Sequence, residues 1–151
     1  MDPVVHETTI AAPIDAIWAA VADLDRIPAW VEGVASIERA PGQSGRLCAG
    51  ARFIQRIRQG LWTVECQGEV IACNPPELLE LAVRHPSLAL RVGYHFRPLD
   101  GRTQIRCQME LLETSLPPAL VASFIRAPAE KLLARQTESL RRLVEAPTRP
   151  A

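Results

Sequence analysis

The sequence has 151 residues, with seventeen basic and seventeen acidic side chains and therefore no net charge. That length supports one domain with a sizeable hydrophobic core, and the balanced charge argues against a protein that binds nucleic acid by neutralising phosphates. No apolar run reaches the ~18 residues of a membrane-spanning helix, and the first residues, M-D-P-V-V-H-E-T, do not resemble a signal peptide. We therefore expect a cytoplasmic protein.

The first elements of the chain are predicted to be a strand and two short helices. Val4 to Ala11 alternates like a strand, and its partners cannot be local because a helix follows at once. Pro13 begins that helix, which has apolar residues at helical spacing: Ile14, Ile17, Trp18, Val21 and Leu24. We expect a second short helix with Asp25 as its cap, Pro28 in its first turn and Gly33 at its end.

The middle of the chain predicts a meander of antiparallel strands. Val34 to Arg39 comes first, followed by a glycine-rich segment, Ala40 to Gly50, which we interpret as a hairpin loop at a pocket mouth. A phosphate-binding loop is not favoured there, because no G-K-[ST] and no helix start follow. Further strands have one apolar and one charged face; they are Ala51 to Arg58, Leu61 to Cys73, Leu79 to Arg84, Leu88 to Arg97 and Thr103 to Leu111.

The strand from Ala51 to Arg58 can be placed in two orientations. If Phe53 and Ile57 face the core, Gln55 comes with them and the three arginines of the strand face water. A register shifted by one residue would bury those arginines without partners, which is costly. We favour the first orientation and keep the second open.

The last segment, Ser115 to Ala146, predicts a long helix capped by Ser115, with a kink or restart at Pro128. Its apolar stripe is Leu120, Phe124, Leu132, Gln136, Leu140 and Leu143/Val144. No other segment is long enough to cover the apolar face of the sheet. We expect a single domain over residues 1–146 and a frayed tail over residues 147–151.

Four short segments resemble the START/SRPBCC superfamily, which has the helix-grip fold, and in particular its polyketide cyclase/dehydrase-like branch. They are Ile10 to Trp18 (I-A-A-P-I-D-A-I-W), Asp25 to Gly33 with Pro28-x-Trp30, Gly50 to Phe53, and Tyr94 to Pro98 followed by Gly101-x-Thr103. The resemblance implies an α+β fold in which a curved antiparallel sheet of about seven strands wraps round a long C-terminal helix, with two short helices after the first strand. It also implies a cavity between sheet and helix that holds hydrophobic or amphipathic ligands.

The inward faces of the predicted strands and helices supply the candidate ligand-binding residues. They are Trp30, Phe53, Gln55, Trp62, Cys66, Leu81, Tyr94, Cys107, Met109, Phe124, Leu132 and Gln136. Such a cavity would be mostly apolar with a few neutral polar groups, which suits an aromatic or lipid-like molecule. For each residue, plain core packing is the alternative.

The sequence offers no recognisable catalytic, metal or cofactor site. His6, His85 and His95 have no carboxylate or nucleophile at a known spacing, and Glu65 and Glu69 share a solvated strand face. The cysteines, Cys48, Cys66, Cys73 and Cys107, lack C-x-x-C spacing and are expected to be free, buried thiols that act as small hydrophobic groups.

Three functions are therefore compatible with the sequence. The first is binding or transport of a small hydrophobic ligand such as a lipid, quinone or polyketide. The second is a polyketide aromatase/cyclase in which Tyr94 and an inward Arg or His polarise a carbonyl. The third, an interaction protein that docks through its last helix, ranks lowest, because no exposed apolar patch is visible in the sequence. The oligomeric state is left open.

Overall fold

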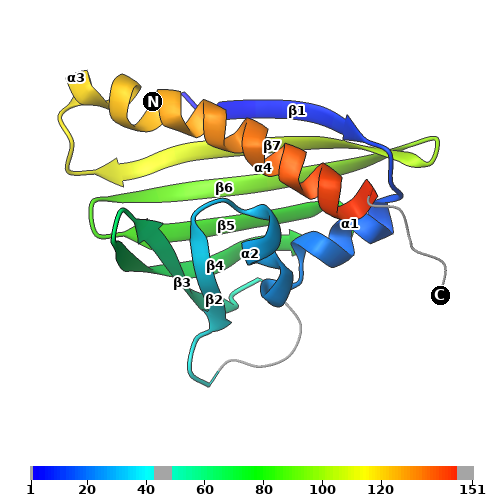
Figure 1. Cartoon of the computed structure of the whole chain (residues 1–151), viewed down its shortest axis with the longest axis horizontal. Helices are drawn as coiled ribbons and strands as arrows, with labels where there is room; N and C mark the ends of the chain where they lie inside the picture. The colour runs from blue at the N-terminus through cyan, green and yellow to red at the C-terminus, as the bar shows by residue number, and fades with distance from the viewer. Residues whose placement is uncertain (1, 43–48, 146–151) are drawn as a thin grey trace.

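The computed structural model of the protein describes residues 2–42 and 49–145. Its centre is a seven-stranded, wholly antiparallel sheet in the order β1-β7-β6-β5-β4-β3-β2. The strands are β1 (Val4–Ile10), β2 (Val34–Arg39), β3 (Arg52–Gln59), β4 (Trp62–Asn74), β5 (Leu78–His85), β6 (Leu88–Leu99) and β7 (Arg102–Thr114). One long helical segment crosses a single face of this sheet (Figure 1). The helix-grip architecture is thus confirmed.

The first strand pairs with the last one, as its lack of a local partner predicted. Val4 lies opposite Met109 and Ile10 lies opposite Thr103. The Thr103 hydroxyl donates a 2.8 Å hydrogen bond to the carbonyl oxygen of Ala12, which fixes the chain where it leaves the sheet. This pairing brings the start of the chain beside the C-terminal helix.

Two short helical elements follow β1: α1 (Ile14–Val21), and η1 (Leu24–Arg26), which runs directly into α2 (Ile27–Trp30). The sequence correctly placed Pro28 in the first turn of α2. The predicted cap was wrong by two residues, since the carboxylate of Asp23 accepts a hydrogen bond from the backbone N–H of Asp25. The short 3-10 turn η1 precedes α2, so the helical segment begins, and is capped, two residues earlier in the chain than predicted.

The C-terminal helical segment is less regular than a single helix with one kink. It consists of α3 (Pro118–Val121), η2 (Ala122–Arg126), which is a π-helical turn, and α4 (Ala127–Glu145). The widened turn stands directly before Pro128, where the proline ring would crowd the carbonyl four residues back in a regular helix. The backbone N–H of Ala127 instead donates to the oxygen of Ala122, five residues earlier.

The predicted start of this segment was also wrong. Pro117 is the capping residue and provides no side-chain hydrogen bond. Ser115 instead donates from its backbone N–H to the carbonyl oxygen of Ser87, over 3.2 Å. Ser115 therefore ties the end of β7 to the β5–β6 turn.

The buried stripe of the C-terminal helix differs from the predicted one at its first two positions. The buried residues are Ile125, Ala129, Leu133, Gln136, Thr137 and Leu140. Leu120 and Phe124 are exposed, with 40% and 64% of their surface accessible. Successive steps of four residues drift by roughly 40° per step, so Phe124 would lie about 160° from Leu140 even on a regular helix.

The core lies between the sheet and the helices. Its side chains alternate along the strands as expected, and the favoured orientation of β3 is confirmed: Phe53 is buried, while Arg56 forms a 2.9 Å ion pair with Glu38 on the other face. The Phe53 ring lies directly over Gly68 on the neighbouring strand, where an added Cβ would be 2.1 Å from the ring. A glycine is therefore required at that position of β4.

Some expectations fall outside the described residues. They concern residues 43–48 of the glycine-rich segment with Cys48, the domain boundary at residue 146 and the tail over residues 147–151. Within the described part, none of the helices combines the length and the apolar character needed to cross a membrane.

Candidate functional site

An interior cavity of about 170 Å³ lies between the sheet, α2 and α4. Its walls are mainly aliphatic and aromatic. The lining residues are Val21, Ile27, Trp30, Val31, Glu32, Val34, Ile37, Gln55, Ile57, Leu79, Leu81, Val83, Leu90, Val92, Tyr94, Met109, Leu132 and Gln136. This volume is below the ~300–1,000 Å³ of typical drug-sized sites, so in this state the cavity fits a small ligand of one or two rings.

Tyr94 and Gln136 form a neutral polar pair in the cavity wall. The Tyr94 hydroxyl donates to Gln136 Oε1 over 3.4 Å, which is a long hydrogen bond, and both residues are buried. Tyr94 comes from β6 and Gln136 from α4, so the pair bridges the two layers. Because the bond is long, these groups are available to a ligand that offers a better-placed polar atom.

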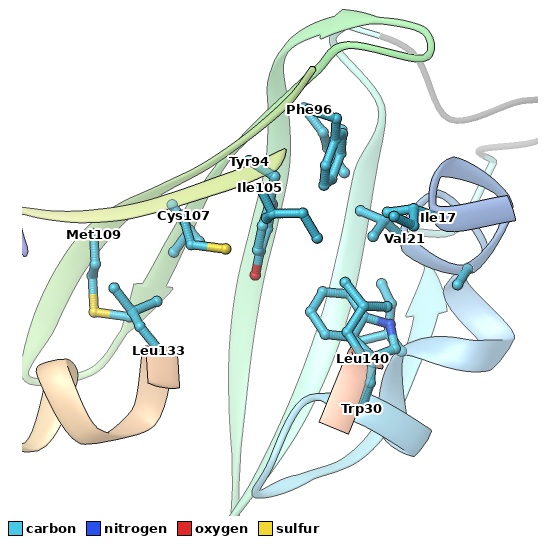
Figure 2. Packing of buried hydrophobic residues seen from close by; sticks show 14 of the residues in the cluster. Ile17, Val21, Trp30, Tyr94, Phe96, Ile105, Cys107, Met109, Leu133 and Leu140 are labelled. Carbon is cyan, nitrogen blue, oxygen red and sulfur yellow. The ribbon is translucent and has the colours of Figure 1, made fainter. Parts of the chain in front are cut away.

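Trp30 of α2 packs against the same tyrosine. The two rings meet edge to face, with centroids 5.7 Å apart and planes at 76°, and Figure 2 shows the Tyr94 hydroxyl pointing from the sheet towards the helix layer. The indole N–H of Trp30 is buried and has no hydrogen-bond partner among the described residues. An unpaired buried donor costs about 1–3 kcal/mol, so this position is not optimised for stability alone.

Burial keeps the Tyr94 hydroxyl and the nearby Cys107 thiol protonated. Removal from water strongly raises the pKa of Tyr94, and it raises the pKa of the Cys107 thiol to about 12. At neutral pH, Tyr94 is therefore a hydrogen-bond donor, and Cys107 behaves as an uncharged small hydrophobic group.

The structure brings seven of the twelve sequence-predicted residues together in the cavity wall. They are Trp30, Gln55, Leu81, Tyr94, Met109, Leu132 and Gln136. They come from two helices and four strands, and strand alternation together with helical spacing was enough to place them on the inward faces. Their contact with a ligand stays a prediction.

Three other predicted residues are buried in the core and do not line the cavity. Phe53 is covered by its contact with Gly68, and Cys66 and Cys107 are 0% and 1% exposed. Their inward direction was predicted correctly. The pattern of alternation cannot say which inward side chain meets empty space, because that depends on the sizes of its neighbours.

The remaining two predicted residues, Trp62 and Phe124, lie on the surface, so their assignment to the cavity was wrong. Trp62 has the inward alternation of β4, yet 76% of its surface is exposed. It is the first residue of that strand, next to the β3–β4 turn, and the following residues become buried only from Cys66 onward. Phe124 is turned outward on the helix, as described above.

Sequence reasoning missed Glu32, a charged residue at the edge of the cavity. It follows α2 and forms a 2.6 Å ion pair with Arg135 of α4, which links the two helices beside the cavity. No periodic signal marks a residue in such a short connection. Several missed aliphatic residues, among them Leu79, Val83 and Leu90, follow from the alternation of β5 and β6.

The cavity wall contains no Lys, Arg or His among the described residues. His95 lies 4.0 Å from Glu80, and His85 lies 3.3 Å from Gln59; neither histidine lines the cavity. Within the same part of the chain, no three His, Cys, Asp or Glu side chains are grouped as metal ligands. The arrangement is therefore suited to binding a neutral, largely apolar molecule.

Comparison with known proteins agrees with this architecture. The model of the family described as "Polyketide cyclase / dehydrase and lipid transport" matches residues 1–145. The chain belongs to this family. The sequence resemblance to the polyketide cyclase/dehydrase-like branch is thereby confirmed.

One curated protein is similar in sequence. It is the granaticin polyketide synthase bifunctional cyclase/dehydratase of Streptomyces violaceoruber, which is 29% identical over 93% of this chain. The match spans 43% of that longer protein, so the present chain corresponds to less than half of it.

Solved structures support the fold. The Zhui aromatase/cyclase from Streptomyces sp. R1128 has a TM-score of 0.69 and 17% identity, with 94% of this chain and 95% of that chain covered. Ara h 8.0201 has a TM-score of 0.75 and 14% identity, with 97% and 99% covered. At these identities the likeness concerns the fold alone.

Proposed function

We propose that this member of the polyketide cyclase/dehydrase family binds a small, neutral, hydrophobic molecule of aromatic or polyketide type in the cavity between its sheet and α4. The observation that carries the proposal is the cavity itself. Apolar residues from both layers surround a neutral Tyr94–Gln136 pair, with no Lys, Arg or His in the described wall. Such a site holds a ligand by apolar burial and orients it by one or two hydrogen bonds.

The experiment is a calorimetric titration of the protein with 1-naphthol, 1,4-naphthoquinone and a medium-chain fatty acid. The Leu132→Phe variant places a larger, rigid side chain in the cavity from α4 and should weaken binding by at least about tenfold, because its ring occupies space that the ligand needs. Leu99→Phe, on the exposed β6–β7 hairpin, is the matched control and should bind as the wild type does. Absence of binding to all three compounds, or equal binding by Leu132→Phe, would reject the proposal.

A second candidate is a polyketide aromatase/cyclase, and the similarity to the granaticin cyclase/dehydratase favours it. In that reaction, the protonated Tyr94 hydroxyl would donate a hydrogen bond to a carbonyl of the bent chain while the apolar wall excludes water. Incubation with a synthetic poly-β-ketone thioester, analysed by mass spectrometry, tests it. Cyclisation that Tyr94→Phe slows by at least about tenfold would support catalysis; an unchanged product pattern with and without protein would exclude it.

A further inference from the structure

The wall of the cavity contains few side chains that can hydrogen-bond to a ligand. Gln55, Tyr94 and Gln136 line it, and Glu32 lies at its edge. The Glu32 carboxylate is engaged in its 2.6 Å ion pair with Arg135, and the Tyr94 hydroxyl already donates to Gln136 Oε1. The two side-chain amides therefore decide which polar group of a ligand this cavity can accommodate.

The Gln136 amide is held in one direction. Its oxygen accepts the hydroxyl hydrogen of Tyr94 over 3.4 Å, and Trp30 packs edge to face against the tyrosine ring and keeps that ring in place. The next residue of α4, Thr137, donates its hydroxyl to backbone oxygens of the preceding turn, so it does not compete for the amide. An amide whose oxygen is engaged in this way presents its two N–H groups on the other side.

These two N–H groups are free and border open space. Within residues 2–42 and 49–145, the Nε2 group of Gln136 has no hydrogen-bond partner. The fully covered side-chain atoms without a partner in that part of the chain are the indole nitrogen of Trp30 and Nε of Arg91, and Gln136 Nε2 is not one of them. Because Gln136 is only 5% exposed and lines the cavity, its N–H groups face the cavity. A buried donor without a partner is costly, so this position favours a ligand that supplies an acceptor.

The other amide, Gln55 of β3, is not held in the same way. Its side chain is half-buried and makes no hydrogen bond to any residue that the structure describes. It can turn either its oxygen or its N–H groups towards a ligand, so it does not distinguish an acceptor from a donor. The Tyr94 oxygen is a weak acceptor, because its electrons are delocalised into the ring. The fixed polar group of the wall is therefore the donor on Gln136.

We propose that Gln136 selects ligands with a carbonyl oxygen, so that the molecule in the cavity is a neutral aromatic ketone or quinone that accepts a hydrogen bond from Gln136 Nε2. The proposal rests on the proposed function, because it requires that the cavity binds an apolar molecule. It adds the polar group that this molecule carries and the residue that recognises it. A ligand without an acceptor would leave the amide unpaired, and a ligand that only donates would place its own N–H against those of the amide.

The test uses three two-ring compounds of nearly equal size in calorimetric titrations. They are 1-indanone, which has a carbonyl oxygen, indole, which donates only, and indane, which has no polar group. For each compound, the affinity of a variant is compared with that of the wild type, so that differences in the hydration of the compounds cancel. Circular dichroism and thermal unfolding confirm that each variant folds.

The double variant Tyr94→Phe/Gln136→Leu removes both polar groups of the pair at nearly constant volume. It should weaken the binding of 1-indanone by at least about tenfold and change that of indane by less than about twofold, because only the ketone loses a hydrogen bond. Gln55→Leu is the matched control in the same wall and should leave the affinity for 1-indanone within about twofold of the wild type.

The single variant Tyr94→Phe tests whether the direction of the amide matters. It leaves Gln136 in place and frees its oxygen, so 1-indanone should still bind, and indole should bind more tightly than it does to the wild type. An unchanged affinity for indole would contradict the role given to the Tyr94–Gln136 hydrogen bond.

Infrared spectroscopy of 1-indanone labelled with ¹³C at the carbonyl gives a readout besides affinity. The carbonyl stretch of the bound ketone should lie at a lower wavenumber in the wild type than in the double variant, because a hydrogen bond weakens the C=O bond. The same wavenumber in both proteins, or equal losses of 1-indanone and indane in the double variant, would overturn the selection by Gln136 and leave the proposed function standing. If none of the three compounds bound to the wild type, both proposals would be rejected.

Discussion

At the residue scale, the clearest constraint in this protein is the contact between Phe53 and Gly68. The two residues are opposite one another on β3 and β4. A Cβ at Gly68 would lie 2.1 Å from two atoms of the Phe53 ring, whereas a Cβ at Gly93 would come no nearer than 3.3 Å to the flexible side chain of Gln108. Both glycines are in strands, yet only Gly68 faces a ring that is itself buried.

We therefore expect Gly68→Ala to destabilise the protein by about 1–3 kcal/mol, as overpacking of a tight core does. Gly93→Ala is the matched control and should change the free energy of unfolding by less than about 1 kcal/mol, because the Gln108 side chain can move aside. Urea denaturation measures both. Phe53→Leu should recover part of the loss in the Gly68→Ala background; additive losses in the double variant would contradict the proposed clash.

At the element scale, the adjacent leucines of α4 show how one helix serves both the core and the cavity. Leu133 is 0% exposed and belongs to the core, whereas Leu132 is partly buried and lines the cavity. The helix turns its side chains by roughly 100° per residue, so neighbouring residues can face a packed wall and an open space.

Leu133→Ala should lower the free energy of unfolding by about 3–5 kcal/mol, because it creates a new void in a packed region. Leu132→Ala should lower the free energy of unfolding clearly less, since its side chain already borders empty space. The same substitution should enlarge the cavity enough to bind a three-ring aromatic that the wild type excludes. Thermal unfolding and calorimetric titration measure the two effects. Equal destabilisation by the two substitutions would show that the cavity is closed in solution.

The same helix shows why helical periodicity located the C-terminal element but did not predict correctly all of the residues that face the sheet. From Leu132 to Leu140 the predicted residues face the sheet side, because this stretch is a regular helix: Gln136 and Leu140 are buried, and the half-buried Leu132 lines the cavity beside the buried Leu133. Before Pro128, the prediction continued in four-residue steps, which drift round even a regular helix, and Phe124 was placed inside while Ile125 is the buried residue.

At the scale of the whole molecule, stability rests on apolar burial rather than on ion pairs. Every ion pair found among the described residues lies at the surface, and even the 2.6 Å pair of Arg135 and Glu32 has side chains that are 58% and 54% exposed. Exposed ion pairs contribute little to the stability of the fold, because water and salt screen the charges and the long side chains lose entropy when they are fixed.

The free energy of unfolding should therefore change by less than about 1 kcal/mol between low and high sodium chloride. The balanced charge of the chain, seventeen of each sign, also leaves no net repulsion for salt to relieve. Urea titrations at the two salt concentrations measure the difference. A loss of several kcal/mol at high salt would mean that the surface pairs cooperate as a network.

The sequence by itself determined the order of the elements, the non-local pairing of β1, the alternation that buries Phe53 and exposes Arg56, and the family. These properties follow from local rules, since side chains alternate along a strand and recur at fixed angles along a helix, and proline and glycine mark the turns. Those rules also placed seven cavity residues on the correct faces.

Only the tertiary structure decided where the covered part of the sheet ends and which inward side chains border empty space. Trp62 obeys the alternation of β4 and is nevertheless exposed, because it stands at the first residue of that strand, where the described residues leave it uncovered. Cys66 and Leu81 both point inward, yet only Leu81 lines the cavity. Whether a side chain is covered, and whether it borders a cavity, depends on how distant segments pack together. No periodic pattern within one segment encodes that packing.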